Sequence, residues 1–254
     1  MKKILVLTHD ASEGLGTFGD FLTSSQVRTY TVRLFEGGKL PGNLEKFDGI
    51  VVMGGPMSVY DEAVYPFLSA ETKFLSEATE ANVPILGICL GAQLIAKACN
   101  VQVEKAPVSE VGWKQIHVTE EGRRDILLQG LPERLHVFQW HEDAFEVPHG
   151  GILLVTGDEC RNQAFRYGNA YGLQFHLEVT QNMLEDWFPD HTVQEIYVRT
   201  FKKIEYEYSM YARMIYSNFM WLLDLYQQSR RHRSKRSSRV WSGGYGDVWN
   251  RRNN

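Results

Sequence analysis

Cysteine is scarce in this chain of 254 residues, and the three that occur are Cys89, Cys99 and Cys160. An odd, sparse set without paired spacing excludes a disulfide scaffold and a cysteine-based zinc site, and it favours a reducing, cytoplasmic location. The sequence also has no uninterrupted apolar run of about 18 residues, so we expect no membrane span. A Walker-type glycine loop is absent as well, which argues against a nucleotide-binding domain of that class.

The first residues, MKKILVLTHD, superficially resemble a signal peptide because two lysines precede an apolar run. That run lasts only four or five residues before Thr8, His9 and Asp10. It is too short for the hydrophobic region of a signal peptide. We therefore interpret it as a first buried strand.

Charge is divided unevenly along the chain. The formal net charge is −4, but residues 230–254 carry eight Lys or Arg and one acid, so this part is +7 and the remainder is −4 − 7 = −11. Such a shift marks a boundary near residue 229. Residues 229–254 have little to bury, so we predict a basic, disordered tail. Nucleic-acid or anionic-membrane contact is the disfavoured alternative, for which the tail offers Trp241, Tyr245 and Trp249.

Short apolar runs bounded by turn residues recur in the first part of the chain, at 4–8, 30–35, 49–55 and 84–88. They are rich in Val and Ile and do not alternate, which is typical of strands buried on both faces of a parallel sheet. A crossover helix is predicted over 61–82, with Pro66 in its first turns. This order predicts an α/β fold, a mostly parallel open sheet with helices on both faces.

Shorter strand-like pieces follow, at 114–118, 135–140, 151–156 and 170–179. In open α/β sheets, functional sites lie at the carboxyl ends of strands. Candidate chemistry is therefore sought where apolar runs end.

Cys89 lies at such an end, in the pattern Gly87-Ile88-Cys89-Leu90-Gly91. This pattern has the form of a nucleophile elbow, in which a strand turns sharply into a helix and projects the nucleophile. The start of the following helix also favours a thiolate. A buried structural cysteine is the more common alternative, and it stays open at this point.

A nucleophilic cysteine needs a base and a group that orients the base. His176 lies in a strand-like run with Glu178 two positions later, so the period of two places both side chains on one face. Upstream, Gly54-Gly55-Pro56 ends a buried strand and can present backbone N–H groups to a ligand. The alternatives are a solvated strand face and an ordinary tight turn.

Taken together, GGPMS, GICLGAQ and GLQFHLEV, in that order and spacing, resemble the class I, triad-type glutamine amidotransferases. EVGWKQI (110–116) and FQWHEDAF (138–145) are similar to the stand-alone proteins that match the amidotransferase domain of GMP synthase. The resemblance covers roughly residues 1–223. It implies a three-layer, flavodoxin-like fold and no cofactor or metal.

The resemblance also implies roles. Cys89 is the nucleophile, His176 the general base and acid, and Glu178 the group that orients His176. The oxyanion is stabilised by the N–H groups of Gly55 and Leu90. A γ-glutamyl thioester forms and is hydrolysed, which releases glutamate and ammonia. The remaining implied substrate-binding residues are Gly54, Gln93, Gln139, Trp140 and His141.

Two positions depart from the family pattern. Many relatives have proline between the histidine and the glutamate, where this chain has Leu177, a change expected to loosen the strand. Relatives often read His-Gly-Asp where this chain has His141-Glu142-Asp143. Glu142 would place an anion near the glutamine site and affect which acyl donor fits.

Several functions stay open. No ATP-using synthetase domain is attached to the resembling region, so ammonia would pass to an acceptor on a separate synthetase chain or to bulk water. A γ-glutamyl hydrolase or peptidase with the same triad is the main alternative, and a non-catalytic binding protein is the next. A zinc deaminase, which also uses His-x-Glu, is excluded because no cysteine follows Cys160.

The region after residue 190 predicts a helix. Thr192-Val193-Gln194-Glu195 has the form of a capping box, and an apolar stripe continues at spacings of three and four. We expect the stripe to pack on its own domain, with a homodimer or partner interface as the alternative. The predicted organisation is thus a domain over 1–190, a helix over 191–228 and the tail over 229–254.

Overall fold

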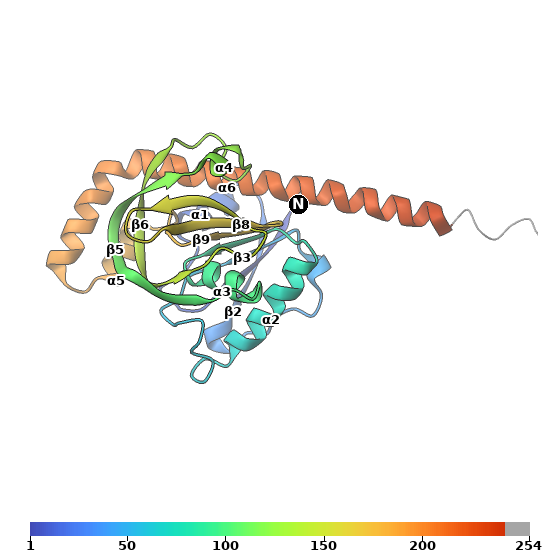
Figure 1. The fold of residues 1–254 in the computed structure, drawn as a ribbon, viewed down its shortest axis with the longest axis horizontal. Coiled ribbons are helices and arrows are strands. Elements are labelled where there is room, and N and C mark those ends of the chain that lie inside the picture. Colours follow the sequence, from blue (N-terminus) through green and yellow to red (C-terminus); the bar gives the residue numbers. More distant parts are fainter. Residues whose placement is uncertain (242–254) are drawn as a thin grey trace, which may run out of the picture.

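The structure, a computed structural model, describes residues 1–241, with side chains through residue 232. Within this range one nine-stranded sheet forms, with strand order β2-β1-β3-β4-β9-β8-β7-β5-β6 (Figure 1). In chain order the strands are β1 (Lys3–Thr8), β2 (Arg28–Arg33), β3 (Gly49–Val52), β4 (Ile85–Ile88), β5 (Val103–Val118), β6 (Arg134–Phe145), β7 (Ile152–Gly157), β8 (Asn162–Tyr167) and β9 (Ala170–Leu173).

The sheet has a parallel half and an antiparallel half. Strands β2, β1, β3, β4 and β9 pair in parallel. Of the strands predicted to be buried on both faces, β1, β3 and β4 are buried. The prediction is wrong for β2, because it lies at the edge of the sheet and is mostly exposed. From β9 outward, β8, β7, β5 and β6 pair antiparallel, and β5 with β6 forms the longest pairing. The pieces predicted at 114–118 and 135–140 are parts of the longer strands β5 and β6 of the antiparallel half.

Six α-helices lie in the described range: α1 (Gly16–Ser24), α2 (Phe67–Glu80), α3 (Leu90–Ala98), α4 (Glu120–Arg124), α5 (Gln181–Trp187) and α6 (His191–Trp241). Two short 3-10 turns span Leu34–Glu36 and Leu44–Lys46. The predicted crossover helix over 61–82 is shorter in the structure, because Pro66 stands immediately before its first residue, Phe67.

Helices cover both faces of the sheet. Alternate residues of β1 enter different cores: Ile4 packs in a cluster with Phe18 of α1, whereas Leu5 packs in a cluster with Leu68 of α2. Helices α1 and α6 contact each other, as do α2 and α3. The predicted three-layer α/β fold with a C-terminal helical extension is therefore confirmed.

Helix α6 is longer than predicted and starts differently. It continues through Trp241, past the predicted boundary at residue 228, so residues 229–241 are helical. Its first turn is capped by Asp190, whose carboxylate accepts hydrogen bonds from the N–H groups of Thr192 (2.8 Å) and Val193 (3.3 Å). The predicted capping box with Thr192 as the cap is therefore wrong. Tyr245 and Trp249 of the predicted tail lie outside the described residues.

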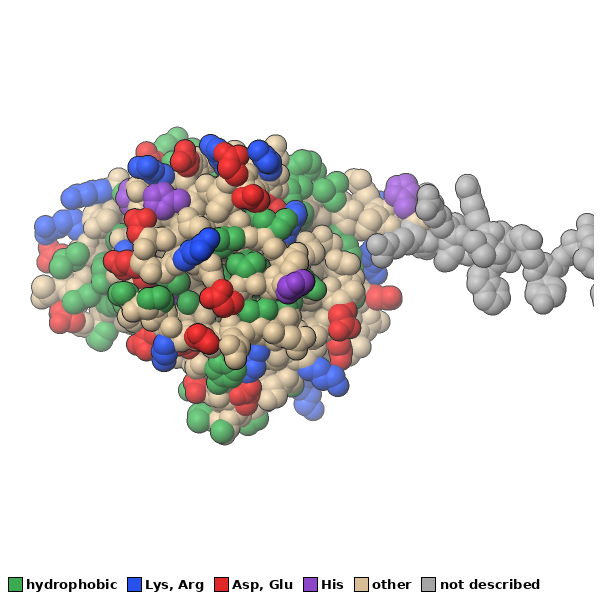
Figure 2. Space-filling model, viewed as in Figure 1, with side chains coloured by type: hydrophobic (Ala, Val, Ile, Leu, Met, Phe, Trp, Pro, Cys, Tyr) green, Lys and Arg blue, Asp and Glu red, His purple; other side chains and the backbone are tan. Residues whose placement is uncertain are grey.

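The apolar stripe of α6 packs on the domain. Its buried members share one core with β-strand residues and with α1: Phe201, Tyr208, Ala212, Ile215, Tyr216, Phe219 and Leu223. Figure 1 shows that the helix bends after its first turns and then runs along the body. In the described part of the chain, no helix combines the length and apolar character needed to cross a bilayer. On the face in Figure 2, acidic and basic side chains are interspersed.

Candidate active site

Cys89 occupies the sharp turn between β4 and α3. Its backbone has φ 51° and ψ −109°, a conformation that is costly for a residue with a side chain and that occurs preferentially at functional sites. The flanking glycines permit the turn, since a Cβ on Gly87 would lie 2.5 Å from the Gly91 carbonyl oxygen, and one on Gly91 would lie 2.2 Å from the Val52 carbonyl oxygen. The elbow geometry expected from the sequence is present.

His176 and Glu178 lie together, but not for the predicted reason. Strand β9 ends at Leu173, so the expectation of an alternating strand over 170–179 is wrong. His176 is instead fixed by an isolated bridge to Phe138 of β6: its N–H donates to the Phe138 carbonyl at 2.9 Å. The imidazole Nδ1 still donates to Glu178 Oε1 at 2.6 Å, with both side chains buried.

Leu177 contributes to the position of the Glu178 carboxylate. Its backbone N–H donates to Glu178 Oε2 at 3.0 Å, so both carboxylate oxygens are engaged. A proline at this position would lack that N–H. The expectation that Leu177 loosens a strand is wrong, because the segment is not a strand and the residue adds a hydrogen bond.

The His176 imidazole is set up to carry a proton. Burial acts to lower the pKa of His176, but the Glu178 carboxylate and hydrogen bonds with Cys89 and Glu178 outweigh it and hold the pKa well above its ordinary value. A protonated imidazole at this position can give its proton to a group bound at the Cys89 sulfur.

The Gly54-Gly55 turn lies beside the same groups. A Cβ on Gly54 would lie 3.4 Å from His176 Cε1, and a Cβ on Gly55 would lie 2.7 Å from Leu90 Cδ2. Among the described residues, neither the Gly55 N–H nor the Leu90 N–H forms a hydrogen bond. Both N–H groups of the predicted oxyanion hole therefore lack a hydrogen-bond partner among the described residues, as donors reserved for a ligand would.

A buried ion pair that the sequence argument missed supports this turn. His9 Nδ1 donates to the Gly54 carbonyl at 2.9 Å, and His9 Nε2 lies 2.9 Å from Glu71 Oε2. Burial would lower the pKa of His9, but Glu71 raises it above its ordinary value. The available signal was the position of His9 directly after a buried strand, at the sheet edge where sites occur.

A pocket of about 680 Å³ opens over Cys89 and includes Gln93, Trp140 and His141 in its lining. Gln174, which the sequence argument did not single out, links Gln93 to the sulfur. Gln93 Nε2 donates to Gln174 Oε1 at 3.3 Å, and Gln174 Nε2 donates to Cys89 Sγ at 3.8 Å. The Cys89 thiol also contacts the Trp140 carbonyl oxygen at 3.7 Å.

Gln139 does not line this pocket. It is fully buried, and its Nε2 donates to Gln163 Oε1 at 2.6 Å. Gln163 Nε2 in turn donates to Glu110 Oε2 at 2.7 Å. The structure thus places the Gln139 side chain in a network behind the site, and only its neighbours Trp140 and His141 face the pocket.

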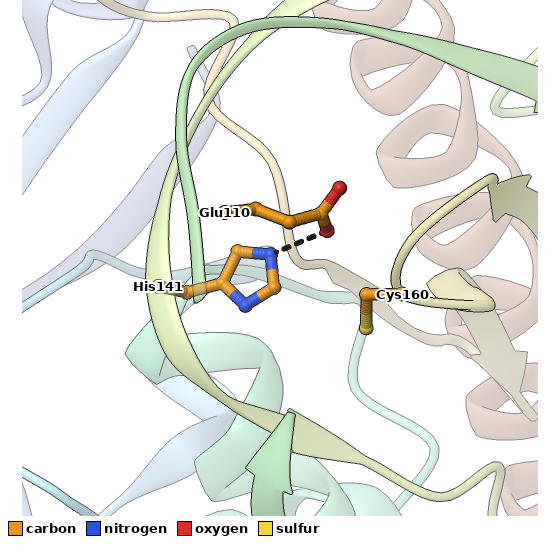
Figure 3. Close-up of side chains that lie close together, drawn as sticks. All are labelled: Glu110, His141 and Cys160. Atoms are coloured by element: carbon orange, nitrogen blue, oxygen red, sulfur yellow. Dashed lines mark hydrogen bonds and ion pairs between the residues drawn. The ribbon is translucent and has the colours of Figure 1, made fainter. Parts of the chain in front are cut away.

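Glu110, His141 and Cys160 are the described residues whose arrangement could hold a metal ion, with ligand atoms within 4.8 Å of one another (Figure 3). His141 Nε2 lies 3.0 Å from Glu110 Oε2, and Nδ1 lies 3.0 Å from the Asp143 carbonyl oxygen, so both ring nitrogens are engaged. Burial raises the pKa of the Cys160 thiol to about 11. These residues fit a network that orients His141 better than they fit a metal site.

Acidic side chains dominate the charged lining of the pocket, namely Glu13, Asp61, Glu142, Asp143 and Asp186. Among the described residues, Lys105 is the one Lys or Arg in that lining, and it pairs with Glu142 at 3.3 Å and Asp143 at 2.9 Å. Glu142, which the sequence analysis expected to place an anion near the glutamine site, does line the pocket. Glu13, which the sequence argument missed, lies beside the Gly54 turn.

Glu13 makes stability depend on pH. Burial raises the pKa of Glu13 to about 7 from an ordinary 4.5, with the His176 charge opposing the rise and Glu178 adding to it. The folded protein therefore holds this proton more tightly than the unfolded chain, and stability falls as pH rises from about 4.5 to about 7. The side chain in Glu13→Gln is neutral at every pH. We therefore expect the free energy of unfolding of the wild type to fall by about 2 kcal/mol relative to that of this variant between pH 5 and pH 8.

Urea unfolding of both proteins at the two pH values measures this difference. Asp186→Asn, at an exposed acid of the same pocket, is the control and is expected to follow the wild-type pH dependence. If the free energy of unfolding depended on pH equally in wild type and Glu13→Gln, the raised pKa of Glu13 would be contradicted.

Comparison with known proteins agrees with this geometry. The model of the family described as "Glutamine amidotransferase class-I" matches residues 18–192. The glutamine amidotransferase-like protein YfeJ of Salmonella typhimurium is 33% identical over 201 residues, which cover 76% of this chain and 82% of that protein. One of the subunits of the glutamine-hydrolysing GMP synthase of Sulfolobus acidocaldarius is 36% identical over 140 residues, 54% of this chain and 70% of that relative.

The fold is shared with solved structures. A glutamine amidotransferase from Thermotoga maritima superimposes with a TM-score of 0.79 at 29% identity, over 86% of this chain and 97% of that one. The family match includes Cys89, His176 and Glu178, the residues that the fold brings together. This chain is a member of the class I glutamine amidotransferases.

Proposed function

We propose that this protein hydrolyses the side-chain amide of glutamine through a γ-glutamyl thioester on Cys89 and releases glutamate and ammonia. The observation that carries the proposal is the convergence of three groups. Cys89 stands at a strained turn and is one of the groups that raise the pKa of His176, and the His176 imidazole is held in turn by Glu178 at 2.6 Å. A nucleophile, a base and an orienting carboxylate are the parts that acyl transfer requires.

Acylation begins with attack of the Cys89 thiolate on the amide carbon of glutamine. The carbonyl oxygen becomes an oxyanion, which the N–H groups of Gly55 and Leu90 stabilise. The tetrahedral intermediate collapses as protonated His176 transfers its proton to the amide nitrogen and the C–N bond breaks. Ammonia leaves, His176 is neutral, and the γ-glutamyl group is bound to the sulfur.

Deacylation uses the same groups in reverse. Neutral His176 takes a proton from water, and the resulting hydroxide attacks the thioester carbon. Collapse of the second intermediate breaks the C–S bond and frees glutamate. The cysteine leaves as a thiolate beside protonated His176, so the pair is restored for the next cycle.

Gly54, Gln93 and the Trp140–His141 backbone are proposed to hold the amino-acid end of glutamine. Gln93, Trp140 and His141 line the pocket beside Cys89, which supports this role. Gln139 would contribute only through its backbone, because its side chain bonds to Gln163.

We further propose that ammonia is delivered to a synthetase on a separate chain in the cytoplasm. Similarity to the GMP synthase relative of Sulfolobus acidocaldarius supports an arrangement of this kind, since that relative is itself named as one subunit of its enzyme. A homodimer is a second arrangement that the proposal admits.

A γ-glutamyl hydrolase or peptidase is the second candidate, and the pocket favours it. The volume of about 680 Å³ lies well within the range of small-molecule sites, and it leaves room beyond the glutamine side chain. The acidic lining would suit an acyl donor whose leaving amine carries positive charge. The same thioester chemistry would serve both candidates.

The test measures glutamate and ammonia released from glutamine and from a panel of γ-glutamyl amides, and quenched samples are examined by mass spectrometry for an acyl group on the Cys89 peptide. Glutamate and ammonia in equal amounts from glutamine would support the amidase. Turnover of the γ-glutamyl amides alone would support the hydrolase. No turnover and no acylation, with or without a synthetase partner, would leave a non-catalytic binding protein.

A further inference from the structure

The segment that carries His176 and Glu178 has little regular structure of its own. Strand β9 ends at Leu173 and α5 begins only at Gln181. The bridge to Phe138 fixes the segment from one side. The position of the imidazole relative to the Cys89 sulfur therefore depends on the other groups that hold this backbone.

Tyr208 of α6 holds it from the opposite side of the chain. Its hydroxyl accepts a hydrogen bond from the Val179 N–H at 3.2 Å and donates to the His176 carbonyl at 3.3 Å. One hydroxyl thus spans the segment from His176 to Val179. Tyr208 is 1% exposed, so water does not compete for these bonds.

Tyr216, two turns further along α6, supports the same segment through α1. The Tyr216 hydroxyl lies 3.0 Å from Thr17 Oγ1, which donates to the Leu177 carbonyl at 3.4 Å. The Thr17 N–H donates to the Glu178 carbonyl at 2.9 Å. The carbonyls of three consecutive residues, 176 to 178, are therefore held in different ways. The first accepts a hydrogen bond from α6 directly. The second accepts one from the Thr17 side chain of α1, which contacts α6, and the third accepts one from the Thr17 backbone.

Both tyrosines are fixed by aromatic packing. Tyr208 meets Trp113 edge to face at 5.2 Å, and Trp113 Nε1 donates to the Tyr197 carbonyl at the start of α6. Tyr216 stacks on Phe18 of α1 at 4.2 Å. Rigid placement of each ring means that each hydroxyl defines a position in space.

We infer that Tyr208, assisted by Tyr216, is a positioning residue for His176 and Glu178, so that α6 is part of the working site. This inference rests on the proposed function. Almost all of α6 lies beyond the family match, which ends at residue 192. The working site thus extends to a helix beyond the residues that the family model matches, and this helix controls the geometry of the catalytic segment.

Tyr208→Phe tests the inference because it removes only the hydroxyl. We expect kcat for the acyl donor to fall about 10- to 100-fold with KM nearly unchanged, since a small displacement of a base costs rate rather than binding. Tyr216→Phe should act in the same direction with a smaller effect. Tyr206→Phe, on the same helix with 82% exposure, is the matched control and should retain wild-type kcat.

A second readout separates positioning from simple loss of stability. The rate of Cys89 alkylation by iodoacetamide is followed against pH in folded protein, at a temperature below the melting transition of every variant. If Tyr208 positions His176, its loss weakens the thiolate–imidazolium pair, and the alkylation midpoint moves to higher pH. A Tyr208→Phe protein with kcat and alkylation midpoint both like those of Tyr206→Phe would overturn the inference.

The two readouts also distinguish failure of the inference from failure of the proposed function. If wild type hydrolyses no γ-glutamyl compound, the proposed function is wrong, yet the alkylation midpoint still reports on His176 and Cys89. A shifted midpoint in Tyr208→Phe would then support positioning without turnover. An unshifted midpoint would refute it.

Discussion

Cys89→Ala is expected to reduce glutamine or γ-glutamyl amide hydrolysis to background, a loss of about 10⁴-fold or more in kcat. In the proposed mechanism the sulfur is the atom that forms the thioester, and no other described thiol lies in the pocket lining. Alanine also relieves no part of the strained turn, because any side chain there meets the same φ of 51°. The protein should therefore stay folded and lose only the reaction.

Cys99→Ala is the matched control. Cys99 ends the same helix, α3, and burial raises the pKa of its thiol to about 11, so it stays protonated near neutral pH. We expect Cys99→Ala to keep wild-type turnover. Steady-state release of glutamate, together with the mass of the Cys89 peptide after rapid quenching, provides the measurement. Substantial turnover by Cys89→Ala would show that another group is the nucleophile.

Glu178→Gln is expected to lower kcat by about 10³- to 10⁴-fold with the fold retained. The carboxylate accepts two hydrogen bonds, from His176 Nδ1 at 2.6 Å and from the Leu177 N–H at 3.0 Å. Glutamine has nearly the same shape but only one oxygen, so one of these two donors would face an amide NH₂ group. The substitution also removes the negative charge that raises the pKa of His176.

The expected sign follows from that pKa. Without the carboxylate, burial dominates and the pKa of His176 falls, so less imidazolium is present to protonate the leaving amine. The pH at which activity declines should therefore move to lower values in Glu178→Gln. A pH profile of kcat measures this shift, and thermal unfolding checks the fold. Glu185→Gln changes an exposed carboxylate of α5 and is the control, so it should leave the pH profile of kcat and thermal unfolding unchanged. Activity of Glu178→Gln within tenfold of wild type would refute the orienting role of Glu178.

Local sequence patterns were sufficient for the buried strands β1, β3 and β4 of the parallel half of the sheet. The runs at 4–8 and 84–88 correspond to β1 and β4, because strands buried on both faces must be apolar throughout. Strand β8 was not predicted, since NQAFRY mixes polar and apolar residues and its pairing with β7 and β9 is not local. The end of β9 at Leu173 was also missed, because LQFHLEV alternates like a strand although its backbone pairs only once.

In the candidate site too, features with a local sequence signal were predicted, and features that depend on contacts between distant segments were not. Cys89 and the Gly54-Gly55 turn were found because glycines at a strand end leave a sequence signal. His9 with Glu71, and Tyr208 with Val179, were not found. These partners are separated by 62 and 29 residues, and each contact exists only because two elements pack together. Glu13 was missed for a related reason, since burial rather than its neighbours in sequence shifts its pKa.

The sequence by itself determined the α/β class and the order of the three motifs, and it predicted which residues would be nucleophile, base and orienting carboxylate. These features depend on residue type and on spacing along the chain, both of which are local. Only the tertiary structure decided how His176 and Glu178 are held. A bridge to β6, a Leu177 N–H and a tyrosine of α6 replace the strand that alternation suggested, because hydrogen bonds between distant segments depend on packing and leave no periodic trace in the sequence.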